Sequence, residues 1–343
     1  MAAQAGGDLE YGRHLLALDR AEEALGVFAA VAEQARREHG GVHPRTLEAR
    51  ADVVDALIAA GRLAEGEAEA RALVHAYGAK AYADAGFAMP RHRSHMQLAK
   101  VLSQAGRVRE AIDVSEAVLP AAARELGTDH PYVLVSRVNR AQHLALLGRF
   151  AQAQAEGTAL AAIAASLAER GDPNAAVVRL AVANGLAFSY AECGMPVEAE
   201  RWARGSLAEA EQLLGGHSDF AQGLRLNLLT GLVGQGRHEE ALAEAEWLPA
   251  FSAAQPGSRS LVRAEALYGL GRLADAEAEA LRALEEAGPR LAPIHHRILR
   301  TRTLLALVHG SPHEMHAVAS AWTEHFGPDH PRARAAWAAV RLG

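Results

Sequence analysis

A tight turn recurs eight times along this chain of 343 residues, and a stretch of helical character stands on each side of every turn. The first turn is centred on Asp19, and the other seven carry a glycine: Gly61, Gly106, Gly148, Gly194, Gly236, Gly271 and Gly310. Successive turns are about 35 to 46 residues apart, a period that is typical of stacked repeat architectures. One helical hairpin cannot bury its apolar face alone, so the spacing predicts an array in which neighbouring hairpins cover one another.

The composition favours helices and disfavours strands. Half of the residues are apolar but only 5% are aromatic, so the core must consist largely of alanine and leucine. Alanine is the best helix former, and few stretches show the alternation of β-branched residues that strands require. We therefore predict an all-α fold.

Each predicted hairpin has the same internal pattern. The helix before the turn carries apolar residues three and four positions apart, as at Leu98, Val101 and Leu102. Five residues after the turn glycine a small residue recurs, where it lets the second helix pack closely on the first: Gly66, Ala111, Ala153, Ala199, Ala241 and Ala276. Glycine at the turn suits the positive φ that ends many helices.

A second loop type follows alternate hairpins. It reads REHGGVHPRTLEAR from Arg37, RELGTDHPYVLVSR from Arg124, QLLGGHSDFAQGLR from Gln212 and EHFGPDHPRARAAW from Glu324. Glycine ends one helix there, and proline stands in the first turn of the next, where its missing N–H costs little. We expect the intervening Asp, Ser and His side chains to cap free N–H groups of the following helix.

These motifs resemble the tetratricopeptide repeat, and the LG..HP loop resembles its kinesin-light-chain subtype, which is common in actinobacterial proteins. The clearest match is LGTDHPYVLVSRVNRAQHLALLGRFAQAQAEGTAL, from Leu126. The resemblance implies a right-handed α-solenoid superhelix of about eight hairpins, forming a single domain over residues 8–342 with a capping helix at 331–343 that contains Trp337. Most aromatic positions of the family hold Ala or Leu here, and the Gly236–Gly271 unit is short.

The resemblance also implies that the first helix of each hairpin lines a concave groove. Nine residues before the turn glycine stand Asp52, Gln97, Asn139, Gly185, Asn227, Val262 and Thr301. Six residues before it stand Asp55, Lys100, Gln142, Phe188, Thr230, Glu265 and Leu304. In the family an asparagine at the first position grips a peptide backbone, as Asn139 and Asn227 could, with Asn184 one position away.

The candidate partner-binding residues are therefore Asp52, Asp55, Gln97, Lys100, Asn139, Gln142, Asn184, Phe188, Asn227 and Thr230. An amide offers both a donor and an acceptor, so it can pair with a main chain of any sequence. The competing interpretation is that these side chains solvate an exposed face or satisfy one another between units. Arginines eleven positions before the glycine (Arg50, Arg137 and Arg225) are predicted to form a structural ladder between units with acidic neighbours.

Several other classes of site are disfavoured. The net charge is −6, and the sequence lacks the basic stripe that nucleic-acid binders usually carry. The single cysteine, Cys193, cannot form an internal disulfide and is expected to pack as a small hydrophobe. Among 17 histidines, His309, His313 and His316 have helical spacing, but Gly310 and Pro312 interrupt it, so no metal site is expected.

No catalytic or cofactor motif stands in the sequence, and GLVGQG at Gly231 follows a helix, unlike a phosphate loop. We also expect no secretory leader and no membrane span, hence a cytoplasmic protein. The leading hypothesis is a non-enzymatic scaffold that holds a protein or peptide in its groove, without a cofactor, nucleic acid or membrane. The alternative is a ligand- or peptide-responsive regulator that acts in trans on a transcriptional or biosynthetic partner.

Overall fold

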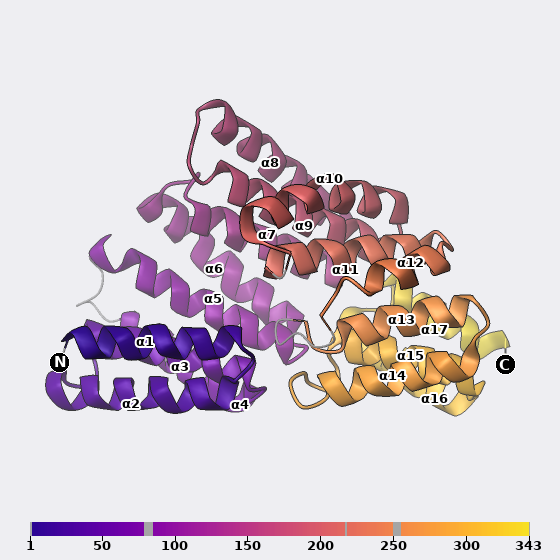
Figure 1. The fold of residues 1–343 in the computed structure, drawn as a ribbon, viewed down its shortest axis with the longest axis horizontal. Helices are drawn as coiled ribbons and strands as arrows, with labels where there is room; N and C mark the ends of the chain where they lie inside the picture. Colours follow the sequence, from indigo (N-terminus) through magenta and orange to yellow (C-terminus); the bar gives the residue numbers. More distant parts are fainter. Residues whose placement is uncertain (1, 79–84, 217, 250–254, 343) are drawn as a thin grey trace. The chain divides into compact units, whose positions relative to one another are not determined.

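A computed structural model describes residues 2–78, 85–216, 218–249 and 255–342. Within these ranges all regular structure is helical, which confirms the predicted all-α fold. The chain forms two compact units (Figure 1): unit 1 comprises Met1–Thr128 and Pro289–Leu291, and unit 2 comprises Asp129–Gly288 and Ala292–Gly343. A single domain over residues 8–342 stays a prediction.

The described residues of unit 1 form three helical hairpins and a short 3-10 turn. Its elements are α1 (Ala2–Ala17), α2 (Ala21–His39), α3 (Pro44–Ala59), α4 (Leu63–Tyr77), η2 (Ala85–Phe87), α5 (Ala88–Gln104) and α6 (Val108–Leu126).

Unit 2 contains the remaining five hairpins and a terminal helix. Its elements are α7 (Pro131–Leu146), α8 (Phe150–Glu169), α9 (Ala175–Glu192), α10 (Pro196–Leu214), α11 (Asp219–Gly234), α12 (His238–Ala245), α13 (Ser258–Gly269), α14 (Leu273–Ala287), α15 (His296–His309), α16 (Pro312–Phe326) and α17 (Pro331–Leu342). Among these described helices none is long and apolar enough to span a bilayer.

Within each unit the helices stack in chain order. Consecutive helices touch, and so do alternate ones, α1 with α3 and α3 with α5 in unit 1, and α7, α9, α11, α13 and α15 in turn in unit 2. The odd-numbered helix of each hairpin is called its first helix below. This pattern of contact between first helices makes the fold an α-solenoid, in which every hairpin shields its neighbour's apolar side.

The eight turns have the backbone geometry that their sequence predicts. At every turn the glycine, or Asp19 in the first, has a positive φ between 58° and 77°. The following N–H then bonds back to the helix, as when Arg62 N donates to the carbonyl of Leu57 at 2.9 Å. Glycine adopts this left-handed conformation at no steric cost, and aspartate tolerates it better than most residues.

Histidine and serine side chains of the second loop type cap the helix that follows, as predicted. The Nδ1 atoms of His43 and His130 accept from the N–H groups of Arg45 and Tyr132, both at 3.3 Å. His330 does the same for Arg332 at 3.2 Å. His217 lies outside the described residues. The neighbouring Ser218 caps α11, since its Oγ accepts from Ala221 N at 3.3 Å.

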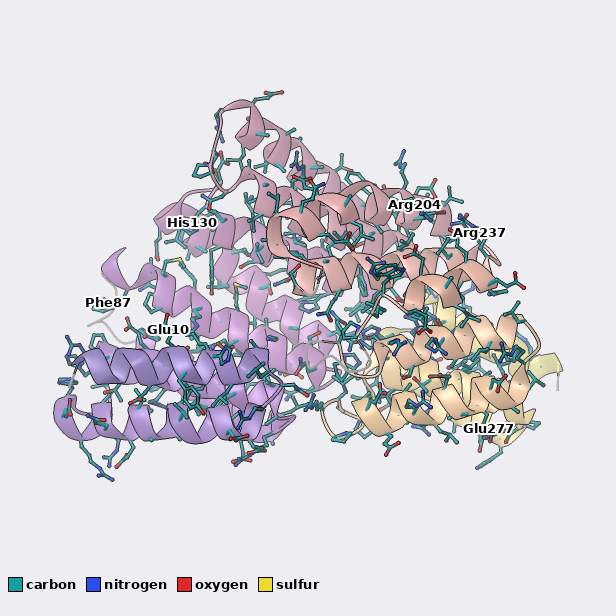
Figure 2. All side chains as sticks on the ribbon, in the orientation of Figure 1. Glu10, Phe87, His130, Arg204, Arg237 and Glu277 are labelled. Carbon is teal, nitrogen blue, oxygen red and sulfur yellow. The ribbon has the colours of Figure 1, made fainter. Side chains whose placement is uncertain are left out.

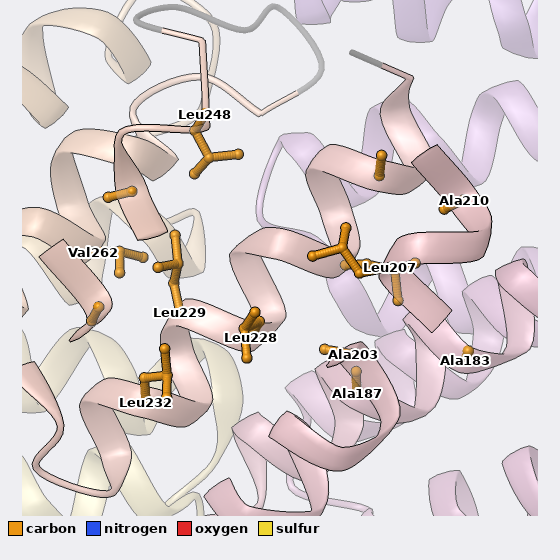
Figure 3. Packing of buried hydrophobic residues seen from close by; sticks show 14 of the residues in the cluster. Ala183, Ala187, Ala203, Leu207, Ala210, Leu228, Leu229, Leu232, Leu248 and Val262 are labelled. Atoms are coloured by element: carbon orange, nitrogen blue, oxygen red, sulfur yellow. The ribbon is translucent and has the colours of Figure 1, made fainter. Parts of the chain in front are cut away.

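Small residues let the helices of unit 2 pack closely. In one part of its core, shown in Figure 3, Leu228 of α11 lies beside Ala187 of α9 and Ala203 of α10, and Leu229 lies on the side of Val262 of α13. The small residues predicted five positions after each turn glycine are buried: Gly66, Ala111, Ala153, Ala199, Ala241 and Ala276.

The arginine ladder differs from its prediction in one respect. Arg137 pairs with Glu156 at 2.7 Å, and Arg225 pairs with Glu244 at 2.8 Å. Arg50 likewise pairs with Glu69, again 19 residues later. These partners lie on the second helix of the same hairpin, so the arginines stabilise each hairpin internally. Arg225 in addition contacts Glu211 on α10 of the preceding hairpin. The predicted pairing between repeats is therefore found at Arg225, whereas Arg50 and Arg137 pair within their own hairpins.

Some ion pairs between hairpins start at the turns. Arg237, just after its turn glycine, pairs with Glu200 of the preceding hairpin at 2.7 Å and with Glu240 of its own at 2.5 Å. Arg204 also contacts both carboxylates, and Figure 2 shows Arg204 and Arg237 on this side of unit 2. Such partly exposed pairs add at most about 1 kcal/mol each.

Candidate functional site

The two rows of predicted groove residues occupy different environments. Nine positions before the turn, Gln97, Asn227 and Thr301 are buried between helices. Six positions before it, Gln142, Thr230 and Glu265 are only half-buried. Side chains that are buried against a neighbouring first helix serve packing. The row six positions before the turn therefore offers more accessible surface to a partner.

In unit 1 the predicted carboxylates are already paired. One guanidinium, that of Arg93, lies 2.6 Å from Asp52 and 2.7 Å from Asp55. Arg13 adds a contact to Asp52 at 3.2 Å. The charges of these aspartates are therefore offset within the unit.

The other two candidates of unit 1 differ from each other in exposure. Gln97 is buried, and its Nε2 donates to the carbonyl of Ala51 at 2.7 Å, which ties α5 to α3. Lys100, one turn further along α5, is exposed. Of the candidates in unit 1, Lys100 is the one whose side chain extends into solvent.

In unit 2 two of the predicted asparagines bond to each other. Asn227 Nδ2 donates to Asn184 Oδ1 at 2.8 Å and to the Asn184 carbonyl at 3.2 Å. The two side chains thus satisfy each other's hydrogen-bonding groups between successive hairpins, which was the competing interpretation of these residues. The amide donor of Asn227 holds α11 to α9.

Asn139 and Gln142 have free amides by comparison. Both lie on α7, three residues apart and half-buried, and the described residues offer neither side chain a hydrogen-bond partner. Phe188 of the adjacent helix α9 is also half-buried and meets His296 edge to face, with 6.1 Å between ring centroids. These three side chains place two amides and an aromatic ring on neighbouring first helices.

A cavity of about 500 Å³ lies in unit 2 and contains Thr230 from the predicted set. Glu265 and Leu304, at the same position of the next two hairpins, line it as well. The other lining residues are Ala191, Gly194, Pro196, Val233, Gly234, His238, Tyr268, Gly269, Arg300, Thr303, Leu307, Trp322, Arg332 and Ala335. First helices α9, α11, α13 and α15 therefore share this space with α16 and α17.

A chain of buried charges crosses one side of the cavity. Arg332 of α17 contacts both carboxylate oxygens of Glu192 on α9, each at 3.1 Å, although the two residues are 140 positions apart. Arg300 of α15 lies 3.7 Å from Glu192 and 2.8 Å from Glu265 of α13. Four helices are thus linked by alternating charges.

The surroundings keep Glu192 ionised. Burial alone would raise the pKa of Glu192, but the charges of Arg332 and Arg300 outweigh it and lower that pKa to about 2. Burial lowers the pKa of the adjacent His330 to about 4, with Glu192 acting against this shift. At neutral pH the carboxylate is therefore charged and the imidazole neutral.

Glu192 and Arg332 were missed by the sequence analysis, although one signal was present. Two residues before the turn glycine, the other hairpins carry Ala59, Gln104, Leu146, Gly234, Gly269 and Val308, so Glu192 is the one carboxylate at this position. A charge where the repeats place neutral residues indicates a specific partner. The identity of that partner depended on the return of α17 to α9.

The histidines do not converge on an ion. His309 ends α15 and contacts Glu277 and Glu314, each at 3.1 Å, while His313 and His316 belong to α16. His295 and His296 adjoin with 4.4 Å between ring centroids. In the described ranges no three His, Cys, Asp or Glu side chains are placed to hold a metal ion. Cys193 is half-buried at the end of α9.

A family model described as tetratricopeptide repeat matches residues 91–165, which span α5 to α8. A tetratricopeptide repeat protein from Parabacteroides merdae is 15% identical with a TM-score of 0.43, covering 86% of this chain and 98% of that one. TPR-like repeats assigned to a Podospora anserina kinesin light chain are 16% identical with a TM-score of 0.38, covering 78% and 97%. Among curated proteins, none matches.

Proposed function

We propose that this tetratricopeptide-repeat protein is a scaffold that holds an extended segment of a protein partner against the first helices α7 and α9 of unit 2. Tetratricopeptide repeats are in general protein-interaction modules, and the residues named here deepen that assignment. The observation that carries the proposal is the pair of unpartnered, half-buried amides of Asn139 and Gln142 on α7, with Phe188 half-buried on the adjoining helix α9.

The amides suit a main chain better than a particular side chain. Each amide can donate to a carbonyl and accept from an N–H, so together they can pair with successive peptide units of any sequence. Phe188 adds an apolar contact for one partner side chain. The neighbouring pair Asn184–Asn227 is engaged internally and serves to fix the spacing of α9 and α11.

Micromolar binding of the partner segment requires both hydrogen bonds and apolar contacts. Each hydrogen bond contributes about 0.5–1.5 kcal/mol net, so four bonds supply roughly 2–6 kcal/mol. Micromolar binding needs about 8 kcal/mol. Burial of apolar surface, at about 25 cal/mol per Å², has to supply the remainder, and Phe188 is placed to contribute to it.

The test begins with a photoreactive phenylalanine, p-benzoylphenylalanine, placed at Phe188 in the producing cells. Irradiation is expected to crosslink a partner segment that mass spectrometry identifies. The same residue placed at Trp247, 71% exposed after α12, is the control for random encounters. Equal yields at both positions, or no adduct at Phe188, would contradict the proposal.

Binding of the identified segment is then titrated with the variant Asn139→Ala/Gln142→Ala. Loss of two amides is expected to weaken binding by about 1–3 kcal/mol, or roughly fivefold to 150-fold. The matched control is Gln152→Ala/Thr158→Ala on the exposed face of α8 in the same hairpin. Unchanged affinity of the first variant would show that the partner does not use these amides.

A further inference from the structure

The cavity of unit 2 has largely apolar walls. Tyr268, Leu304, Leu307 and Trp322 supply large side chains, and glycines and alanines supply much of the rest. Its volume of about 500 Å³ falls in the range of roughly 300–1,000 Å³ that is typical of small-molecule sites. An apolar body of this size would be removed from water by the cavity, which is favourable in proportion to the area covered.

Three neutral polar side chains of the wall are bonded within the protein, whereas Nδ1 of His238 is buried there without a hydrogen-bond partner among the described residues. Thr230 Oγ1 donates to the Leu226 carbonyl at 2.9 Å, and Thr303 Oγ1 donates to that of Leu299 at 2.7 Å. Trp322 Nε1 donates to Thr303 Oγ1 at 3.1 Å. A ligand therefore meets the methyl groups and ring faces of these residues, and its polar contacts fall to the charged side of the cavity.

That charged side contains two guanidinium and two carboxylate groups. Arg300 and Arg332 line the cavity together with Glu265, while Glu192 lies behind them. Arg332 contacts Glu192 through Nε and Nη2, so among the described residues its Nη1 is not bonded to a carboxylate. A third guanidinium, that of Arg297 on the adjacent turn of α15, gives this cluster an excess of positive charge.

Arg297, one turn before Arg300 on α15, has a backbone carbonyl, that of Pro256, at 3.4 Å. In the described part of the chain no carboxylate lies within ion-pair distance of it. Burial, with Arg300 second, lowers the pKa of Arg297 to about 10, so it stays charged at neutral pH. Burial likewise lowers the pKa values of His296 and His330, which are therefore neutral. Arg297 does not line the cavity, but with it the charge cluster on this side contains three guanidiniums and two carboxylates.

We infer that this cavity binds an amphipathic monocarboxylate, a small molecule with an apolar body and one carboxylate directed at Arg332 and Arg300. A carboxylate offsets the excess guanidinium charge and accepts charge-assisted hydrogen bonds, which are stronger than neutral ones. The apolar body occupies the space between Tyr268, Leu307 and Trp322. This site is separate from the amides of Asn139 and Gln142, so it goes beyond the proposed scaffold function.

The first experiment uses the full chain and a fluorescent anion, 1-anilinonaphthalene-8-sulfonate, displaced by dodecanoate or by dodecanol. The two competitors share their alkyl chain and differ in charge. We expect one probe molecule per protein, and displacement by dodecanoate at a concentration about tenfold or more below that of dodecanol. Circular dichroism at each condition confirms that the protein is folded.

A second experiment locates the ligand. Ala335 of α17 is exposed and lines the cavity, so Ala335→Trp fills the space without replacing a buried side chain. We expect it to weaken dodecanoate and dodecanol about tenfold or more, since both lose the same apolar contacts. Ala317→Trp is the control, because Ala317 is an exposed alanine on α16 that does not line the cavity.

A third experiment tests the charge. Ala335→Glu adds a carboxylate at the cavity wall, and Ala335→Gln adds a side chain of the same size without charge. The Glu variant is expected to lose about tenfold in dodecanoate affinity relative to the Gln variant, while dodecanol binds both alike. Neither buried ion pair is altered, so both variants should fold.

Three results would overturn the inference. They are equal displacement by dodecanoate and dodecanol, unchanged binding in Ala335→Trp, and absence of probe binding to the folded protein. None of these results bears on partner capture at Phe188, because the substitutions leave Asn139, Gln142 and Phe188 intact. Conversely, failure of the partner test leaves the cavity experiments unaffected.

Discussion

At the residue scale, glycine has two distinct uses in this chain. Gly194 and its equivalents provide the positive φ of the turns. Gly231, inside α11, instead provides space, because a Cβ added there would lie 2.9 Å from the carbonyl oxygen of Pro196 and 3.1 Å from Glu200 N. Gly231 and Gly234 of GLVGQG therefore allow the start of α10 to approach α11 closely.

We predict that Gly231→Ala destabilises unit 2, even though alanine favours a helix by about 0.8–1.0 kcal/mol over glycine. The contact is with backbone atoms, which cannot move aside like a side-chain end, so overpacking should cost about 1–3 kcal/mol. Gly205→Ala on the exposed face of α10 is the control, since its Cβ meets nothing within 4 Å and should stabilise slightly. Thermal unfolding measures both, and a stabilised Gly231→Ala would contradict the prediction.

At the element scale, α17 does more than cover the last hairpin. Its N-cap His330 stacks on Trp322 of α16, with 5.3 Å between ring centroids. The same residue lies beside the α7–α8 turn, where a Cβ on Gly148 would be 3.7 Å from His330 Cα. Arg332 then reaches Glu192 on α9. The capping helix predicted at 331–343 thus joins the last hairpin of unit 2 to its first two.

We predict that Arg332→Ala destabilises unit 2 by about 3–5 kcal/mol, because it leaves the buried carboxylate of Glu192 with only the more distant Arg300. Arg170→Ala provides the comparison. Arg170 pairs with Asp129 at 2.8 Å, but both side chains are exposed, so its loss should cost about 0–1 kcal/mol. Urea unfolding measures the difference, and similar costs for the two variants would show that the buried pair adds no stability.

At the scale of the whole molecule, the two units differ in their buried titratable groups. Unit 2 holds His143 and His330, whose pKa values burial lowers to about 4, and His295 and His296, whose pKa values burial lowers well below the usual 6.5. In unit 1 burial also lowers the pKa of His92, where Glu125 opposes the shift, and of His95, where the Arg91 carbonyl opposes it. Acid should therefore act mainly on unit 2.

A histidine whose pKa is lower in the folded state binds protons more readily when unfolded. Its contribution to stability is present above pH 6.5 and is lost as the pH falls toward 4. Glu192, with a folded pKa of about 2, acts in the same direction below its ordinary pKa of 4.5. The free energy of unfolding of unit 2 should therefore fall steadily between pH 7 and pH 5.

The variant His330→Asn tests this prediction. Asparagine is a good N-cap and does not titrate, so the variant should lose about 1–2 kcal/mol less stability than the parent between pH 7 and pH 5. Its stability at pH 7 falls as well, because the ring contact with Trp322 is lost. His313→Gln, at an exposed position of α16, controls for the substitution. Parallel pH profiles for all three proteins would contradict the assignment to His330.

The sequence by itself determined the helical hairpins, their turns, their caps and the small residues at their crossings. These features depend on backbone conformation within a few residues: a positive φ at Gly61, a free N–H beside His130, and close packing at Ala199. Because the same local constraint recurs in every repeat, the pattern could be read directly.

Only the tertiary structure decided which polar side chains remain free for a partner. Whether an asparagine is engaged depends on a side chain some 40 residues away, as for Asn227 with Asn184, or on none, as for Asn139. The cavity and the Glu192–Arg332 pair depend on how far unit 2 curves before α17 meets α9. That curvature is the sum of small rotations between successive hairpins, to which no single motif corresponds.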